Sequence, residues 1–176
     1  MKIFHWIFCV NLLPLFSKAC DSDTTKQNTF SAYSIAFQNN GNYPKLYTCD
    51  SLSYSPPISW KNIPAGTASL AVTMHHIPKD GGRHVYMLLY NIPITINSIV
   101  ENEKKIGTWG RNTHNNILGY APPCSKGPGA KPYIITVYAL SKSNILNQKS
   151  GVTYDELQNE IKDNVIAQSS ITVYYS

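Results

Sequence analysis

The sequence predicts a mainly β protein, in the form of a β-sandwich with one or two helices. Three observations lead to this fold class. Short apolar runs alternate with turn-forming clusters, residues 133–140 are rich in β-branched and aromatic side chains, and a helix-capping pattern occurs near the C-terminus. This order of elements favours two packed sheets.

Length and composition indicate one folded domain. The 176 residues can bury a sizeable core unaided, and a hydrophobic content of 43% is that of a globular chain. The formal net charge of +5 falls to +3 without Lys2 and Lys18, because 13 basic and 10 acidic residues then remain. These basic residues form no run, so we expect no nucleic-acid partner.

Residues 1–19 have the pattern of a signal peptide. A lysine supplies the positive start, residues 3–16 are mostly apolar, and Ser17 and Ala19 are small residues where a signal peptidase reads. As a helix the apolar stretch would rise about 21 Å, too little for a hydrocarbon core of ~30 Å. We therefore predict cleavage after Ala19, no transmembrane segment and a periplasmic or secreted protein, with a lipoprotein acylated on Cys20 as the alternative.

Two cysteines, Cys49 and Cys124, remain inside the domain. Cys9 leaves with the leader and Cys20 lies at the mature N-terminus. No cysteine or histidine pair has the spacing of a zinc site, so a structural zinc is not expected. Cysteines of exported proteins commonly pair, which predicts a Cys49–Cys124 disulfide. Two buried free thiols are the alternative.

Apolar runs separated by turns define the predicted strands. Residues 20–29 are polar and form a flexible N-terminal segment, and residues 30–37 then alternate in the manner of a strand. The strongly apolar residues 70–74 and 85–92 predict two further strands with a Pro- and Gly-containing loop between them. Residues 133–140 contain no glycine and are the clearest strand of the chain.

One helix and a last strand are predicted at the C-terminal end. Thr153 and Glu156 have the spacing of a capping box, in which each side chain accepts a hydrogen bond from the other residue's backbone amide. The helix then continues with one apolar face at helical spacing, formed by Leu157, Ile161 and Val165. Residues 171–175 resume a strand pattern.

A series of short motifs occurs in order along residues 30–176. The motifs lie at residues 47–50 (Tyr-Thr-Cys-Asp), 55–60 (Ser-Pro-Pro-Ile-Ser-Trp), 63–67 (Ile-Pro-Ala-Gly-Thr), 70–72 (Leu-Ala-Val), 90–93 (Tyr-Asn-Ile-Pro), 110–112 (Gly-Arg-Asn), 119–120 (Gly-Tyr), 122–124 (Pro-Pro-Cys) and 133–140. In this order they resemble the phosphatidylethanolamine-binding family, which includes bacterial Raf-kinase-inhibitor-like proteins. We assign residues 30–176 to one phosphatidylethanolamine-binding-like domain.

The resemblance implies a β-sandwich with a large antiparallel sheet, a smaller sheet, a C-terminal helix and a small pocket for phosphate-like anions. Members of the family are described as binding phospholipid head groups or as inhibiting kinases or proteases through surface contacts, and bacterial relatives are often dimers. We therefore expect a non-enzymatic protein that binds a small anion, phosphate or a phospholipid head group, and a homodimer is a further expectation. The alternative is an interaction or inhibitor module with a vestigial pocket, acting on a protease or kinase-like partner.

The usual pocket residues of the family are only partly present. Where relatives have an Asp-Pro-Asp segment, this chain has His75 and His76, and Tyr86 stands in place of a strand histidine. In the usual His-Arg-Tyr triplet Lys131 replaces the first residue and only Tyr133 survives. Carboxylate acceptors are thus exchanged for imidazole and ammonium donors. A pocket of His76, Tyr86, Lys131 and Tyr133 would suit phosphate, sulfate or carboxylate.

Two proline-stiffened loops are expected to frame this pocket. Residues 55–58 and residues 119–124 each contain two adjacent prolines, which hold the preceding residues extended. Loops ordered in advance lose little entropy on binding, so Pro122 and Pro123 are further candidates for ligand contact.

Catalysis has little support in the sequence. Gly-x-Ser-x-Gly, His-Glu-x-x-His and Walker motifs are missing, and Asp50 and Asp80 have no partner that suggests acid–base chemistry. We expect no enzyme activity and no cofactor. A hydrolase with an unorthodox site is a third hypothesis for the function. Metal binding by His75, His76 and His84 is a further alternative for the site, although no carboxylate or cysteine completes it at a familiar spacing.

Overall fold

The computed structural model describes residues 28–176 of the chain. The predicted signal peptide (1–19), its cleavage site and Cys20 lie outside these residues, as does most of the predicted flexible segment 20–29. In chain order the elements are β1 (Ser31–Tyr33), β2 (Gly41–Asn42), the 3₁₀ helix η1 (Lys45–Tyr47), β3 (Ile58–Lys61), β4 (Ser69–His76), β5 (His84–Ile92), β6 (Ser98–Ile99), β7 (Thr108–Trp109), β8 (Lys131–Leu140), α1 (Tyr154–Ile161) and β9 (Val165–Tyr175).

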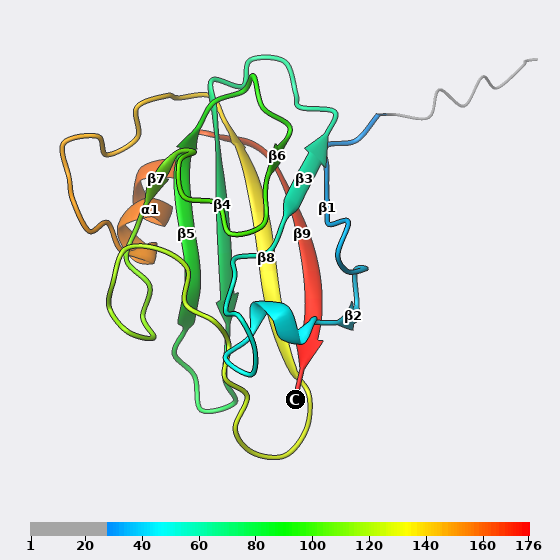
Figure 1. Cartoon of the computed structure of the whole chain (residues 1–176). Coiled ribbons are helices and arrows are strands. Elements are labelled where there is room, and N and C mark those ends of the chain that lie inside the picture. Colours follow the sequence, from blue (N-terminus) through cyan, green and yellow to red (C-terminus); the bar gives the residue numbers. More distant parts are fainter. Residues whose placement is uncertain (1–27) are drawn as a thin grey trace, which may run out of the picture.

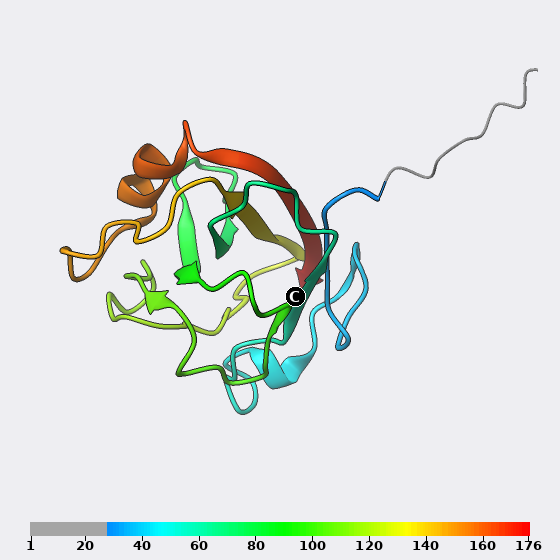
Figure 2. The ribbon, with the colours of Figure 1, turned by 90° about the horizontal axis from the view of Figure 1, so that it is seen from above.

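The strands form a larger and a smaller sheet (Figure 1). The smaller sheet has the order β1-β3-β6, and the larger one has the order β2-β9-β8-β4-β5-β7. Strands of the larger sheet pair antiparallel, except that the short edge strand β2 runs parallel to β9. Seen from above, α1 and β1 lie on opposite sides, with β8 and β9 running between them (Figure 2). The predicted two-sheet β fold with a C-terminal helix is confirmed.

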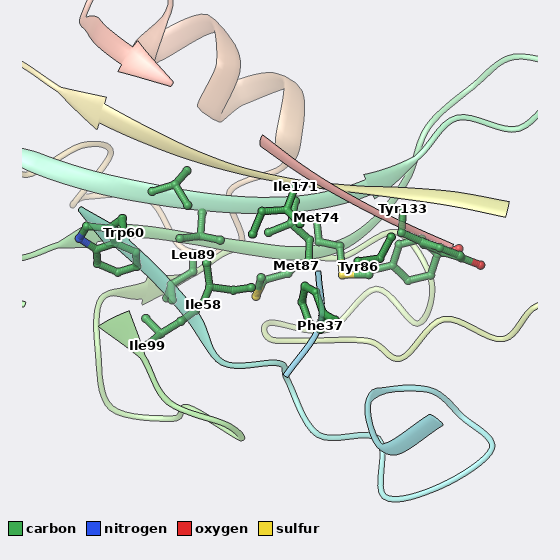
Figure 3. Packing of buried hydrophobic residues seen from close by; sticks show 14 of the residues in the cluster. Phe37, Ile58, Trp60, Met74, Tyr86, Met87, Leu89, Ile99, Tyr133 and Ile171 are labelled. Carbon is green, nitrogen blue, oxygen red and sulfur yellow. The ribbon is translucent and has the colours of Figure 1, made fainter. Parts of the chain in front are cut away.

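Hydrophobic clusters cover both faces of the larger sheet. One cluster lies between the sheets and includes Trp60 of β3, Met74 of β4 and Tyr133 of β8 (Figure 3). The other includes Leu88 of β5 and Leu157 of α1. Because both faces of the sheet are covered, all eight residues of β4 are buried, which explains the continuous apolar run at residues 70–72.

Helix α1 begins at the predicted capping box. The Thr153 hydroxyl accepts from the Glu156 amide at 3.4 Å, and the Glu156 carboxylate accepts from the Thr153 amide at 2.9 Å. A hydrogen bond from Lys149, followed by those from Thr153, lowers the pKa of Glu156 to about 2. The prediction that Val165 continues the helix was wrong, because a turn follows Ile161 and Val165 opens β9 opposite Leu140 of β8. Among residues 28–176, no helix has the length and hydrophobicity that a membrane crossing needs.

The N-terminal strand is shorter than the predicted 30–37. Strand β1 ends at Tyr33, because the Ser34 hydroxyl accepts from the Ala36 amide at 3.1 Å and donates to the Pro57 carbonyl at 2.7 Å. These bonds turn the chain out of the strand direction. The proline-containing residues 55–57 lie outside the strands, as predicted, and β3 begins at Ile58.

Candidate functional site

A cavity of about 230 Å³ lies where β4 ends and where β5 and β8 begin. The eight residues that line it are His76, Pro78, His84, Tyr86, His114, Cys124, Lys131 and Tyr133. The structure thus brings together the four residues predicted for the pocket: His76, Tyr86, Lys131 and Tyr133. Pro122 and Pro123 are not among the lining residues, although the next residue in their loop, Cys124, is.

Strand pairing places two of the histidines side by side. His76 ends β4 and pairs directly with His84, the first residue of β5, and directly paired strand residues project to the same face of a sheet. From the sequence, His84 was predicted only as a possible metal ligand. Its pairing with His76 could have been inferred from the sequence, because a hairpin closed by residues 77–83 brings the two flanking histidines opposite each other.

An irregularity in β5 turns Tyr86 into the cavity. Met74 pairs with Met87, but His75 pairs with Val85, so Tyr86 is an extra residue opposite β4. A bulge of this kind re-aims a side chain. Tyr86 consequently packs edge-on against Tyr133, with ring centroids 5.3 Å apart (Figure 3).

The imidazole of His76 is held in one orientation. It is buried, its Nδ1 lies 2.7 Å from the Pro132 carbonyl, and its ring centroid lies 5.4 Å from that of Tyr133. A carbonyl oxygen only accepts, so Nδ1 carries the proton of this bond. The other nitrogen, Nε2, is left to accept from a ligand when the ring is neutral and to donate to one when the ring is protonated.

Two tyrosines and a lysine supply further donors. Burial raises the pKa of Tyr86 and of Tyr133 above the ordinary phenol value, so both keep their hydroxyl protons at neutral pH, and a hydrogen bond between the two hydroxyls leaves one of these protons for a ligand. Lys131 is half-buried, and its ammonium donates to the Lys126 carbonyl at 2.6 Å. An ammonium has three N–H groups, so two of them remain available to a ligand.

His114 reaches the cavity from a loop that Asn112 organises. The buried Asn112 carboxamide oxygen accepts from the amides of His114 and Asn115, both at 3.0 Å. Its amide nitrogen donates to the carbonyls of Ile117 and Gly119 at 3.0 and 3.4 Å. The sequence analysis missed His114. An Asn two positions before a loop histidine is the signal that could have suggested a fixed turn.

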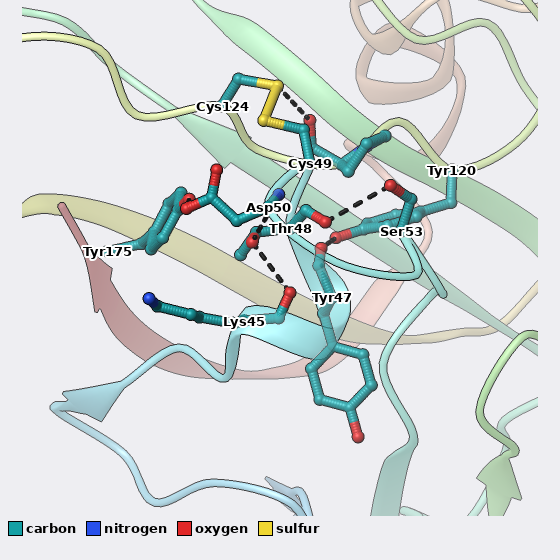
Figure 4. The surroundings of a disulfide bond; sticks show 10 residues. Lys45, Tyr47, Thr48, Cys49, Asp50, Ser53, Tyr120, Cys124 and Tyr175 are labelled. Carbon is teal, nitrogen blue, oxygen red and sulfur yellow. Dashed lines mark hydrogen bonds between the residues drawn. A yellow bond between two sulfur atoms is a disulfide. The ribbon is translucent and has the colours of Figure 1, made fainter.

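The predicted Cys49–Cys124 disulfide is confirmed (Figure 4), and one of its two residues, Cys124, lines the cavity. The two Cα atoms are 5.3 Å apart, within the range for a disulfide. The same two loops are also joined by a hydrogen bond from the Cys49 amide to the Pro123 carbonyl at 3.1 Å, and by one from the Tyr120 hydroxyl to the Tyr47 carbonyl. Pro123 therefore supports the wall through its backbone.

His75 lies on the opposite face of β4, as alternation along a strand requires. Its ring centroid is 5.5 Å from that of Tyr154 on α1, and Nδ1 is buried without a hydrogen-bond partner. Burial, and then the positive charges of Arg83 and His76, lower the pKa of His75. His75 and His76 therefore do not share a site. Within residues 28–176, no three His, Cys, Asp or Glu side chains are placed to hold a metal ion together.

Fold and cavity together define a two-sheet β protein with a small, donor-lined cavity at one end of its larger sheet. Residues 33–176 match the family model described as phosphatidylethanolamine-binding protein. The chain belongs to this family, as the motifs of the sequence suggested.

Relatives and solved structures agree with this assignment. The UPF0098 protein of Chlamydia muridarum is 30% identical over 148 residues, covering 81% of this chain and 95% of the relative. That of Aquifex aeolicus is 29% identical over 149 residues, covering 81% and 86%. A phosphatidylethanolamine-binding protein homolog from Chlamydia trachomatis superposes with a TM-score of 0.77 at 26% identity, covering 85% of this chain and 98% of that one. Escherichia coli YbcL, at 23% identity and a TM-score of 0.75 over 84% and 98% of the two chains, shares the fold.

Proposed function

We propose that this protein is a non-enzymatic binding protein whose cavity takes a small anion, either phosphate or a phosphate-bearing head group. The observation that carries the proposal is the lining of the cavity: three histidines and a lysine converge on about 230 Å³, and none of the eight lining residues is acidic. Donors to a charged oxygen form the stronger class of hydrogen bond, and a site made of such donors favours anions over neutral ligands.

Protonation of the histidines would set the strength of binding. Histidines ordinarily titrate near ~6.5, and a neighbouring anion favours the charged form. The groups around His76 are His84 opposite it on β5, His114 from the loop, and Lys131 and Tyr133 from β8. Because a protonated imidazole donates two charge-assisted hydrogen bonds, affinity for a given ionic form of phosphate should rise when these rings are protonated.

Calorimetric titration with inorganic phosphate between pH 5.5 and 8 tests the proposal. Lys131→Ala should weaken binding by about 1.5–3 kcal/mol, or roughly 10- to 150-fold in Kd, because one charge-assisted bond is lost. His76→Gln should reduce the pH dependence. Lys61→Ala, which removes an exposed lysine of the smaller sheet, is the control for net charge. Binding that is undetectable at every pH would refute the proposal and favour an interaction or inhibitor module.

The disulfide supports the accompanying proposal that the protein works after export, because disulfides persist in oxidising compartments and are rare in the cytosol. Intact-mass measurement of the protein from its native host tests this. We expect a chain that begins at Cys20. A mature chain that still begins at Met1 would contradict export.

A further inference from the structure

A second hollow, of about 470 Å³, adjoins the cavity and is mostly apolar. Its lining consists of His76, Ile77, Pro78, Lys79, Pro128, Gly129, Ala130, Lys131 and Pro132. We call it the proline groove. It shares His76, Pro78 and Lys131 with the cavity. The two spaces therefore adjoin at these three residues.

We propose that the ligand is a soluble phosphate monoester that carries a short apolar substituent and no ammonium group. The phosphate occupies the cavity and the substituent lies in the proline groove. This inference rests on the proposed function and adds the ligand class. The groove, at about 470 Å³, is too small for the two acyl chains of a membrane lipid, so we take the ligand to be a soluble ester.

His76 and Lys131 direct the substituent toward the groove. The bond from His76 Nδ1 to the Pro132 carbonyl holds the ring between the two spaces. The hydrogen bond from the Lys131 ammonium to the Lys126 carbonyl holds the Lys131 side chain between the cavity and the groove. An anion bound by both groups consequently has the proline groove beside it, with the half-exposed Ile77 side chain in its wall.

The charges of both spaces disfavour a cationic substituent. No lining residue of the cavity or of the groove is acidic, whereas Lys79 and Lys131 both line the groove. An aromatic face could also receive an ammonium. Tyr86 and Tyr133 do not offer one, because they are only 7% and 1% exposed. An ammonium would lose hydration in the groove without gaining a partner.

A matched pair of ligands gives the sharpest test. Propyl phosphate and phosphoethanolamine have nearly the same shape and differ in a terminal methyl in place of an ammonium. Titration of the full chain at pH 6 should show propyl phosphate binding at least roughly tenfold more tightly, because the methyl is buried and the ammonium is repelled. Equal or tighter binding of phosphoethanolamine would overturn the inference.

A series of alkyl phosphates tests the groove itself. Each fully buried methylene improves Kd about fourfold, so in a half-open groove we expect a two- to fourfold gain per carbon from ethyl to butyl phosphate. Ile77→Ser should lower the ratio of butyl to inorganic phosphate affinity. Ile94→Ser, at a site that is 46% exposed compared with 50% for Ile77, is the control and should preserve the ratio.

The outcomes separate the two proposals. If inorganic phosphate binds but chain length has no effect, the ligand class is wrong and the anion site stands. If no phosphate compound binds, both the proposed anion site and the proposed ligand class are refuted. Sedimentation with vesicles of phosphatidate and phosphatidylcholine is the last arm. Capture by vesicles without affinity for butyl phosphate would assign the groove to a membrane and overturn the inference.

Discussion

Removing the Cys49–Cys124 disulfide should strongly lower stability while leaving the folded state in place. The bond links residues 75 positions apart. For a loop of this length, the chain-entropy relation gives a stabilisation of about 4.5 kcal/mol at 25 °C, through restriction of the unfolded chain. Two hydrogen bonds still join the native loops. One runs from the Cys49 amide to the Pro123 carbonyl, and the other from the Tyr120 hydroxyl to the Tyr47 carbonyl. Most domains have only ~5–15 kcal/mol of unfolding free energy, so the loss is a large fraction of it.

Urea denaturation of the double variant Cys49→Ser and Cys124→Ser measures this effect. We expect a fall of about 3–4.5 kcal/mol and a larger m-value, because an unfolded chain without the cross-link exposes more surface. Wild-type protein with a reducing agent should behave like the variant, and the variant should not respond to the reducing agent. A loss below about 1 kcal/mol with an unchanged m-value would refute the argument from the unfolded state.

Three further predictions concern Gly110, Asn112 and His75. Gly110→Ala should lower the free energy of unfolding in urea by about 1–3 kcal/mol, because the new Cβ would lie 2.3 Å from Leu88 Cδ2. A variant as stable as the wild type would show that Leu88 moves away at no cost. Asn112→Ala should cost about 1–3 kcal/mol in urea unfolding. It should also weaken phosphate binding, because Asn112 holds the loop of His114. Phosphate affinity equal to that of the wild type would limit Asn112 to a structural role. Burial lowers the pKa of His75 in the folded protein. As the pH falls, the unfolded chain therefore binds a proton at this residue at a higher pH than the folded protein does. The contribution of His75 to stability is then complete above about pH 6.5 and is lost below it. His75→Leu should flatten this acid limb of the denaturation curve, and an unchanged limb would contradict the assignment.

The strand pattern and the helix cap could be predicted because local chemistry determines them. Residues 133–140 are β-branched and aromatic, and they form most of β8. The capping box at Thr153 requires only two residues three positions apart, and it is present in the structure. The end of α1 depends instead on β9 pairing with β8. An apolar Val165 suits either a continued helix or the start of a strand, so the spacing of apolar residues could not distinguish the two.

The cavity was predicted in part, from the motifs that resemble the family and not from the strand pattern itself. Tyr133 lies near the start of β8 and faces the space between the sheets, and its ring contacts that of His76 at the end of β4. The bulge at Tyr86 could not be located, because residues 85–90 are all apolar or aromatic and show no alternation that an extra residue would break. His114 depends on a loop folded around a single asparagine, and nothing in its immediate sequence marks it as facing the cavity.

Pro132 explains why the sheet opens into a cavity at this end. Pairing between β4 and β8 reaches only Ile134, whereas pairing with β9 continues through Pro132 to Lys131. A proline has no amide proton for a ladder, so it ends the pairing on one side, and its carbonyl would be left unpaired. The His76 imidazole donates a hydrogen bond from Nδ1 to this Pro132 carbonyl, at 2.7 Å. The same bond satisfies the strand end and frees His76 Nε2 for the cavity. The Lys-Pro-Tyr sequence therefore builds the candidate site through the backbone of its proline as well as through the side chains of its neighbours.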